Sequence, residues 1–177
     1  DTRHNIPARY EALCGLCGGE FNESLGVSKP YDFRSWVPDA IVVNLGTNDA
    51  SAFEQPPFTI PETGEVCKQR KNPDGTYNRE DLLKFEQAVI DFLKMLRKHN
   101  ESSHIVWAYG MLGYDLTLAI TEAMNTYRNE TGDSNVAFLQ LPDSTPDNLG
   151  AHAHPGPASH ERAAAILTEY FKKKWEV

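Results

Sequence analysis

The chain has 177 residues, of which 40% are hydrophobic and 24% are charged, and its formal net charge is −8. This length suffices for one domain with its own hydrophobic core. The negative charge argues against nucleic acid as a partner, because phosphate binding requires clustered Lys and Arg, and the one cationic run is Lys172–Lys174. No apolar run is long enough to span a membrane, so we expect no membrane partner either.

Residues 38–49, PDAIVVNLGTND, predict a buried strand that ends in a tight turn. The nearly continuous apolar run at 41–45 is typical of a parallel strand covered on both faces. Gly46 allows a sharp turn, so Thr47, Asn48 and Asp49 emerge at the carboxyl end of the strand, where open α/β sheets hold their ligands. The amide of Asn48 can donate there to a developing oxyanion, although an ordinary Asn-Asp turn explains the same pattern.

The other predicted elements alternate between helix and strand. Residues 1–34 predict a long loop region with one short helix near Pro7–Leu13, and residues 50–77, rich in proline, predict an extended loop. Periodicity then predicts a helix at Arg79–His99, a strand at Ile105–Tyr109, a helix at Leu116–Glu130, a strand at Val136–Leu141 and a helix at Pro157–Lys174. This order requires right-handed crossovers and a parallel sheet, so the fold class is α/β, without a domain linker.

A histidine precedes the last predicted helix on a short, stiff loop. In GAHAHPGPASH, residues 150–160, Pro155 restricts His154 to extended geometry, and Gly156 and Pro157 make the turn into the helix. A histidine so placed can act as a general base near neutral pH. Taken alone, a surface histidine in a Pro-Gly loop explains the same pattern.

Together the two motifs resemble the third and fifth blocks of the SGNH (GDSL-type) hydrolases. The segments DFRSWVPDAIVVNLGTND, HIVWAYGML, VAFLQLP and HPGPASHERAA are similar to the catalytic domain of carbohydrate esterase family two, from about Ile6 to the end. The resemblance implies a three-layer αβα sandwich around a parallel, flavodoxin-like sheet. It also implies a carboxylic ester hydrolase that removes acetyl groups from carbohydrate of the xylan type, without a metal or organic cofactor.

The nucleophile of that family is missing here. Its serine sits in a Gly-Asp-Ser block ahead of the GTND strand, and no Gly-Asp-Ser occurs in this chain. The serines before GTND, namely Ser24, Ser28 and Ser35, do not fit a nucleophile elbow. We therefore expect residues 1–177 to be the C-terminal portion of one SGNH domain. The serine would lie on an upstream segment or a second chain; a non-catalytic relative is the alternative.

The resemblance also assigns roles to residues of this chain. His154 becomes the base and Asn48 an oxyanion-hole donor, with Gly46 and Thr47 shaping the substrate-binding turn. The aspartate that many SGNH hydrolases carry just before the histidine is absent, because Ala151 and His152 stand there. This implies a Ser-His dyad whose imidazole is oriented by a backbone carbonyl.

Two further residues near these motifs have expected roles. Trp107, on the strand before Gly110, has the best position among the tryptophans to bind sugar, with core packing as the alternative. Asp49 is expected to brace the GTND turn by bonding backbone amides.

Sequons and cysteines bear on the compartment. Sequons at Asn22, Asn100 and Asn129 fall in predicted loops or at helix ends, where an acceptor is exposed, and so predict a secreted glycoprotein. The cysteines are Cys14, Cys17 and Cys67. We expect a structural disulfide, for example from Cys67 to one of the other two, with one thiol left over.

Other functions stay open at this point. His152, His154 and His160 form a pattern that can bind zinc, but His160 falls on the first helical turn and no carboxylate or cysteine nearby completes the set, so we expect no metal. The resemblance gives His160 a structural role. A non-catalytic carbohydrate-binding relative and an esterase or lipase acting on other esters are the remaining alternatives.

Overall fold

A parallel sheet forms the centre of the molecule. The computed structural model describes residues 6–14, 19–61 and 63–176. Its three parallel strands, β1 (Ala40–Val43), β4 (His104–Tyr109) and β5 (Val136–Gln140), lie in the order β1-β4-β5. In this register Ile41 is opposite Ile105, which is opposite Val136. The α/β fold class with a parallel sheet is therefore confirmed.

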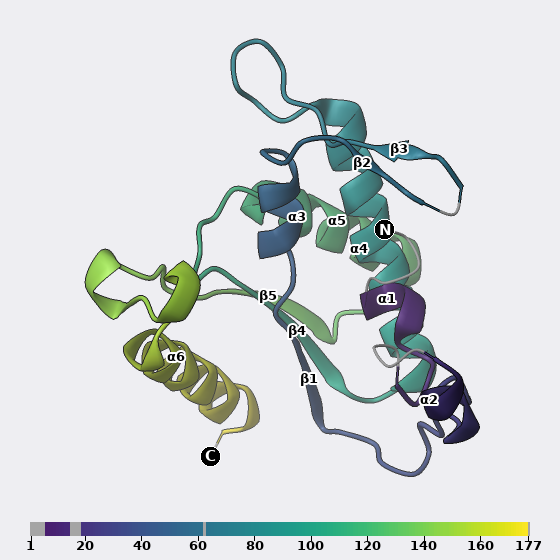
Figure 1. Cartoon of the computed structure of the whole chain (residues 1–177). Helices are drawn as coiled ribbons and strands as arrows, with labels where there is room; N and C mark the ends of the chain where they lie inside the picture. The colour runs from purple at the N-terminus through teal and green to yellow at the C-terminus, as the bar shows by residue number, and fades with distance from the viewer. Residues whose placement is uncertain (1–5, 15–18, 62, 177) are drawn as a thin grey trace.

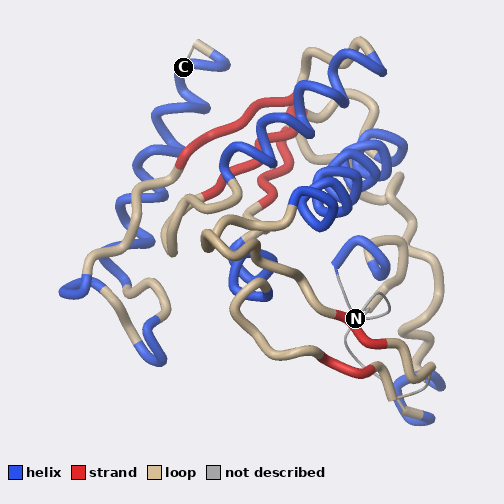
Figure 2. Tube along the Cα trace, turned by 90° about the horizontal axis from the view of Figure 1, so that it is seen from above, coloured by secondary structure: helices blue, strands red, loops and turns tan. Residues whose placement is uncertain are grey.

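Helices cover both faces of this sheet. On one face lie α4 (Arg79–His99) and α5 (Thr117–Thr131), and on the other lies α6 (Pro157–Trp175), as Figures 1 and 2 show. Side chains alternate along β4, because successive residues of a strand point to opposite faces. Trp107 belongs to the core beneath α4 and α5, whereas Ala108 packs in a smaller cluster with Ala163 of α6.

The long helices were predicted well because their end signals are local. Asn78 caps α4 by accepting from the backbone N–H groups of Glu80 and Asp81, and the helix has the predicted bounds. Gly132 ends α5 in the left-handed conformation, at φ 72°. None of the helices in the described part of the chain is long and apolar enough to cross a membrane.

The shorter elements differ from the prediction. The extended loop expected at 50–77 contains a small antiparallel pair, and the loop region before residue 34 contains two short helices rather than one. These elements are α1 (Ile6–Arg9), α2 (Glu20–Ser24), α3 (Thr47–Ala52), β2 (Phe58–Thr59) and β3 (Val66–Cys67). Two 3-10 helices, η1 (Pro146–Asn148) and η2 (Ala151–Ala153), follow β5.

Strand β1 is less covered than its sequence predicts. Val43 is only 5% exposed, but Val42, which faces the other side of the sheet, is 43% exposed. Among the described strands, only β4 pairs with β1, so the far edge of β1 is open. The expectation of a strand buried on both faces is therefore wrong for β1, whereas β4 is buried throughout.

An ion pair fastens the 53–77 segment to α4. The backbone N–H and Nε of Arg70 both donate to one carboxylate oxygen of Asp81, at 2.8 and 2.9 Å. The Asp81 side chain is only 5% exposed but that of Arg70 is 49% exposed, so the bond is shielded from water on the Asp81 side. The hydrogen bonds from Arg70 lower the pKa of Asp81 to about 2.

We predict that Asp81→Asn destabilises the fold in a pH-dependent way. The folded-state pKa of Asp81 lies below the unfolded value, so its stabilisation is present above about pH 4 and is lost as the pH falls through about 2. At pH 7 the variant should lose about 2 kcal/mol of unfolding free energy. Urea unfolding between pH 7 and pH 2 measures this, with exposed Asp91→Asn on the same helix as the control. A loss that does not shrink at low pH would contradict the assignment.

Candidate active site

The GTND turn presents Asn48 at the carboxyl edge of the sheet. Gly46 has φ 126°, and a Cβ atom there would lie 2.9 Å from the Tyr109 ring, so the turn requires glycine for both backbone and space. Helix α3 starts directly after it, with Ala50 N–H donating to the Gly46 carbonyl at 2.9 Å. Asn44 fixes the end of β1 by donating to the carbonyl of Ala108 at 2.7 Å. The exposed side chain of Asn48 is thereby held on a well-defined turn.

The loop that carries His154 is strained and tightly bonded. His152 and Ala153 both have positive φ, 54° and 58°, which is uncommon for residues other than glycine. Gly150 N–H donates to the His154 carbonyl at 2.6 Å. Gly156 packs so closely on Asn148 that a Cβ atom would lie 2.7 Å from its carbonyl oxygen. Such strain persists because the surrounding bonds hold it.

This loop geometry orients the imidazole of His154. Its Nδ1 lies 3.1 Å from the carbonyl oxygen of His152. A carbonyl only accepts, so Nδ1 must carry the proton, which leaves the lone pair of Nε2 available to a substrate or nucleophile. The contact is the kind of backbone carbonyl that the family resemblance implies.

The nearby aspartates do not replace that carbonyl. Asp143 accepts from the backbone N–H groups of Gly113 and Ser144, and Asp147 accepts from the hydroxyl of Thr145. Within the described residues, no carboxylate is hydrogen-bonded to His154.

Asn48 and His154 line one cavity of about 350 Å³. Gly46 and Thr47 line it too, so four of the predicted site residues come together. Sequence reasoning had not placed Asn44 or His160 there, although Asn44 follows a strand end and His160 follows the His154 loop. Met111 and Leu112 give the cavity an apolar side. No serine in the described part of the chain lines it.

Met111 lines the cavity and follows a turn that is as tight as the GTND turn. It follows Gly110, where a Cβ atom would lie 2.3 Å from the Leu141 carbonyl oxygen. Met111 itself has φ 72° and is only 7% exposed. The carboxyl end of β4 is thus bent sharply toward the cavity.

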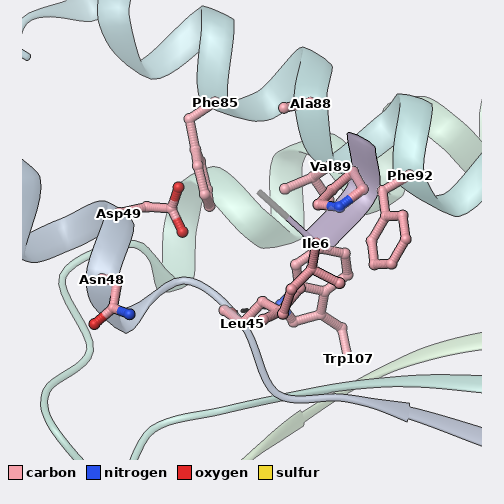
Figure 3. Close-up of a pocket in the computed structure, with 10 residues that line it drawn as sticks. Ile6, Leu45, Asn48, Asp49, Phe85, Ala88, Val89, Phe92 and Trp107 are labelled. Atoms are coloured by element: carbon pink, nitrogen blue, oxygen red, sulfur yellow. Dashed lines mark hydrogen bonds between the residues drawn. The ribbon is translucent and has the colours of Figure 1, made fainter. Parts of the chain in front are cut away.

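Trp107 does not line this cavity. It is 3% exposed, donates from Nε1 to the carbonyl of Leu45 at 3.0 Å and meets Phe92 edge to face. With Leu45 and Phe85 it lines a second, mostly apolar cavity of about 350 Å³ on the α4 side of the GTND turn (Figure 3). Core packing, the alternative considered from the sequence, describes Trp107 better than sugar contact.

Asp49 lies at the edge of the second cavity. The residue is exposed, but its carboxyl group points toward Phe85 (Figure 3), and the protein atoms around that group displace part of its water and raise its pKa. Among the described residues, its one backbone donor is its own N–H. The predicted bracing of the GTND turn by bonds from Asp49 to backbone amides of other residues is therefore not found in the described part of the chain.

Comparisons with known proteins agree with this geometry. No protein-family model matches the chain. An acetyl xylan esterase, Est2A from the rumen bacterium Butyrivibrio proteoclasticus, is 56% identical, with a TM-score of 0.95 over 98% of this chain and 46% of that one. The homologues and structural neighbours are SGNH-type carbohydrate esterases of family two.

Two more relatives extend this finding. A family two carbohydrate esterase from Clostridium thermocellum, solved in complex with cellohexaose, is 25% identical with a TM-score of 0.61, over 90% of this chain and 45% of that one. The cellulase/esterase CelE of Acetivibrio thermocellus is 28% identical over 150 residues, which are 81% of this chain and 15% of CelE. The chain thus spans less than half of these family two esterases, all of which are ester hydrolases by name.

The structure also bears on the other sequence predictions. Asn100 is 3% exposed and its amide donates to the Leu96 carbonyl and the Tyr10 hydroxyl, so it lacks the exposure expected of a glycan acceptor. Asn22 is half-buried and Asn129 is exposed near the end of α5.

The predicted disulfide of Cys67 is wrong, because its thiol is free; Cys17 lies outside the described residues. No group of three metal-ligating side chains is assembled in the described part of the chain.

We predict that Gly46→Ala costs more stability than Gly64→Ala. Both glycines have positive φ, so each alanine is strained. The penalty should be about 1–2 kcal/mol at Gly64, where φ is 71°, and larger at Gly46, where φ is 126° and ψ is −26°, outside the left-handed helical region. Only at Gly46 does the new methyl group also meet the buried Tyr109 ring, which should add about 1–3 kcal/mol. Equal losses in urea unfolding would show that the GTND turn tolerates a side chain at this position.

Proposed function

We propose that the chain carries part of the active site of an extracellular serine esterase that removes acetyl groups from carbohydrate, such as a xylan-type polysaccharide or oligosaccharide. The observation that carries this proposal is the shared cavity of the Asn48 amide and the His154 imidazole at the carboxyl edge of the sheet. The acetyl xylan esterase activity named for Est2A supports the substrate class.

In this mechanism His154 and Asn48 act on one acyl transfer. A serine hydroxyl attacks the acetyl carbonyl while Nε2 of His154 takes its proton. The carbonyl of His152, bonded to Nδ1–H, holds the imidazole in this tautomer. The Asn48 amide donates to the oxyanion. Collapse of the tetrahedral intermediate releases the sugar alcohol, which takes up the proton from His154. The same histidine then activates a water molecule, and this water hydrolyses the acetyl-serine.

The serine would come from a segment that precedes residue 1 of this sequence. No described serine lines the cavity, which supports a nucleophile supplied from elsewhere. The open edge of β1 and the exposed Val42 offer an unpaired apolar strand, which folded proteins normally cover. A parallel strand there would end beside Asn48, making residues 1–177 the C-terminal portion of one domain. The comparisons give no support to a second chain as the source.

The lack of a described serine at the cavity also favours a second candidate function. A relative that keeps the fold and binds carbohydrate without hydrolysing it would need the cavity but no nucleophile. The two functions differ in whether the full-length protein releases acetate.

We predict that His154→Ala lowers kcat of the full-length protein on acetylated xylan and on 4-nitrophenyl acetate by about 10²–10⁴-fold, the range for loss of a general base. Asn48→Ala should lower kcat by about 10²–10³-fold, as for loss of one oxyanion donor. His152→Asn keeps the backbone carbonyl and tolerates positive φ, so it serves as the matched control.

Unchanged turnover in His154→Ala would remove this histidine from the mechanism. If the wild-type full-length protein binds acetylated xylan but releases no acetate, the binding function replaces the esterase.

A further inference from the structure

We propose that His160 binds the sugar hydroxyl next to the acetylated one and so makes the site selective for carbohydrate esters. This inference rests on the proposed esterase function and names a residue that selects its substrate. The family resemblance gives His160 only a structural role.

The position of His160 points to the cavity rather than to a structural contact. It lies on the first turn of α6, where its backbone N–H donates to the Gly156 carbonyl at 3.2 Å. Its side chain is exposed and lines the same cavity as His154. No other described residue is hydrogen-bonded to its imidazole. Within the described part of the chain, both ring nitrogens are therefore available to a ligand in the cavity.

The reaction places the alcohol half of the ester on this side of the cavity. The acyl oxygen must lie at Asn48, the oxyanion donor, and the leaving oxygen must lie within reach of Nε2 of His154, which returns the proton. His160 follows His154 on the same loop and first helical turn. Met111 and Leu112, which line the cavity from the β4 side, suit the acetyl methyl group instead.

The imidazole matches the chemistry of a sugar hydroxyl. A neutral imidazole offers one donor and one acceptor nitrogen, and a hydroxyl can both donate and accept. In a carbohydrate the acetylated oxygen has a hydroxyl-bearing neighbour, which a simple alkyl or aryl ester lacks. A hydrogen bond to that neighbour therefore distinguishes the two kinds of ester, because a site built to bind a hydroxyl discriminates against the analogue without it.

The test uses two esters that differ by one hydroxyl group, trans-2-acetoxycyclohexanol and cyclohexyl acetate, with the full-length protein. The measured quantity is the ratio of kcat/KM for the hydroxy ester to that for the plain ester. We expect His160→Ala to lower this ratio by about three- to tenfold, the value of one neutral hydrogen bond. His160→Gln, which keeps a donor and an acceptor, should recover part of it. The control is Glu161→Ala, an exposed neighbour that does not line the cavity and should leave the ratio unchanged.

An unchanged ratio in His160→Ala, or equal losses on both esters, would overturn the proposal. If the wild-type protein hydrolyses neither ester, a second measurement decides the role of His160. The proposed esterase function itself fails only if the protein also releases no acetate from acetylated xylan. In that case xylohexaose is titrated while the histidine ring signals are observed by NMR. The His160 signals are assigned as those missing from His160→Ala. A shift of these signals in the wild-type protein supports hydroxyl binding, and unchanged signals overturn it.

Discussion

Parallel pairing of β1 with β4, and of β4 with β5, is the constraint on which the candidate site depends. Because the three strands run the same way, their carboxyl ends meet at one edge of the sheet. The GTND turn leaves β1 there, the Gly110 turn leaves β4 there, and the segment after β5 returns there with His154. Residues far apart in the sequence thus line one cavity.

Close backbone approaches then fix the geometry at that edge. Gly46 lies against the Tyr109 ring, and Gly156 lies against the Asn148 carbonyl. Buried Ser159 also fixes this edge. Its hydroxyl donates to the Asn148 side-chain oxygen at 2.9 Å, and this hydrogen bond joins the start of α6 to η1. The positive φ values at His152 and Ala153 fit this pattern, in which several short bonds hold a loop that is costly in isolation. As a result, the carbonyl of His152 is placed where it orients the imidazole of His154.

The sequence predicted what local signals determine and missed what tertiary packing determines. Helix α4 was predicted to the residue because Asn78 caps it and apolar residues recur at helical spacing. The apolar run of β1 predicts a strand but not what covers it, so the exposure of Val42 was missed. Asn100 lies in a glycosylation sequon, yet it is buried, and its amide is hydrogen-bonded to Leu96 and Tyr10. The cavity-facing position of His160 depends on how α6 packs, which its loop sequence does not encode.

The most direct test of the account is active-site labelling of the full-length protein with a fluorophosphonate, which reacts with an activated serine, followed by peptide mapping. The central claim is that Asn48 and His154 serve a nucleophile supplied from outside these residues. The account predicts a single labelled serine that precedes residue 1, with labelling lost in His154→Ala. A labelled serine within residues 1–177, or labelling that does not depend on His154, would contradict it.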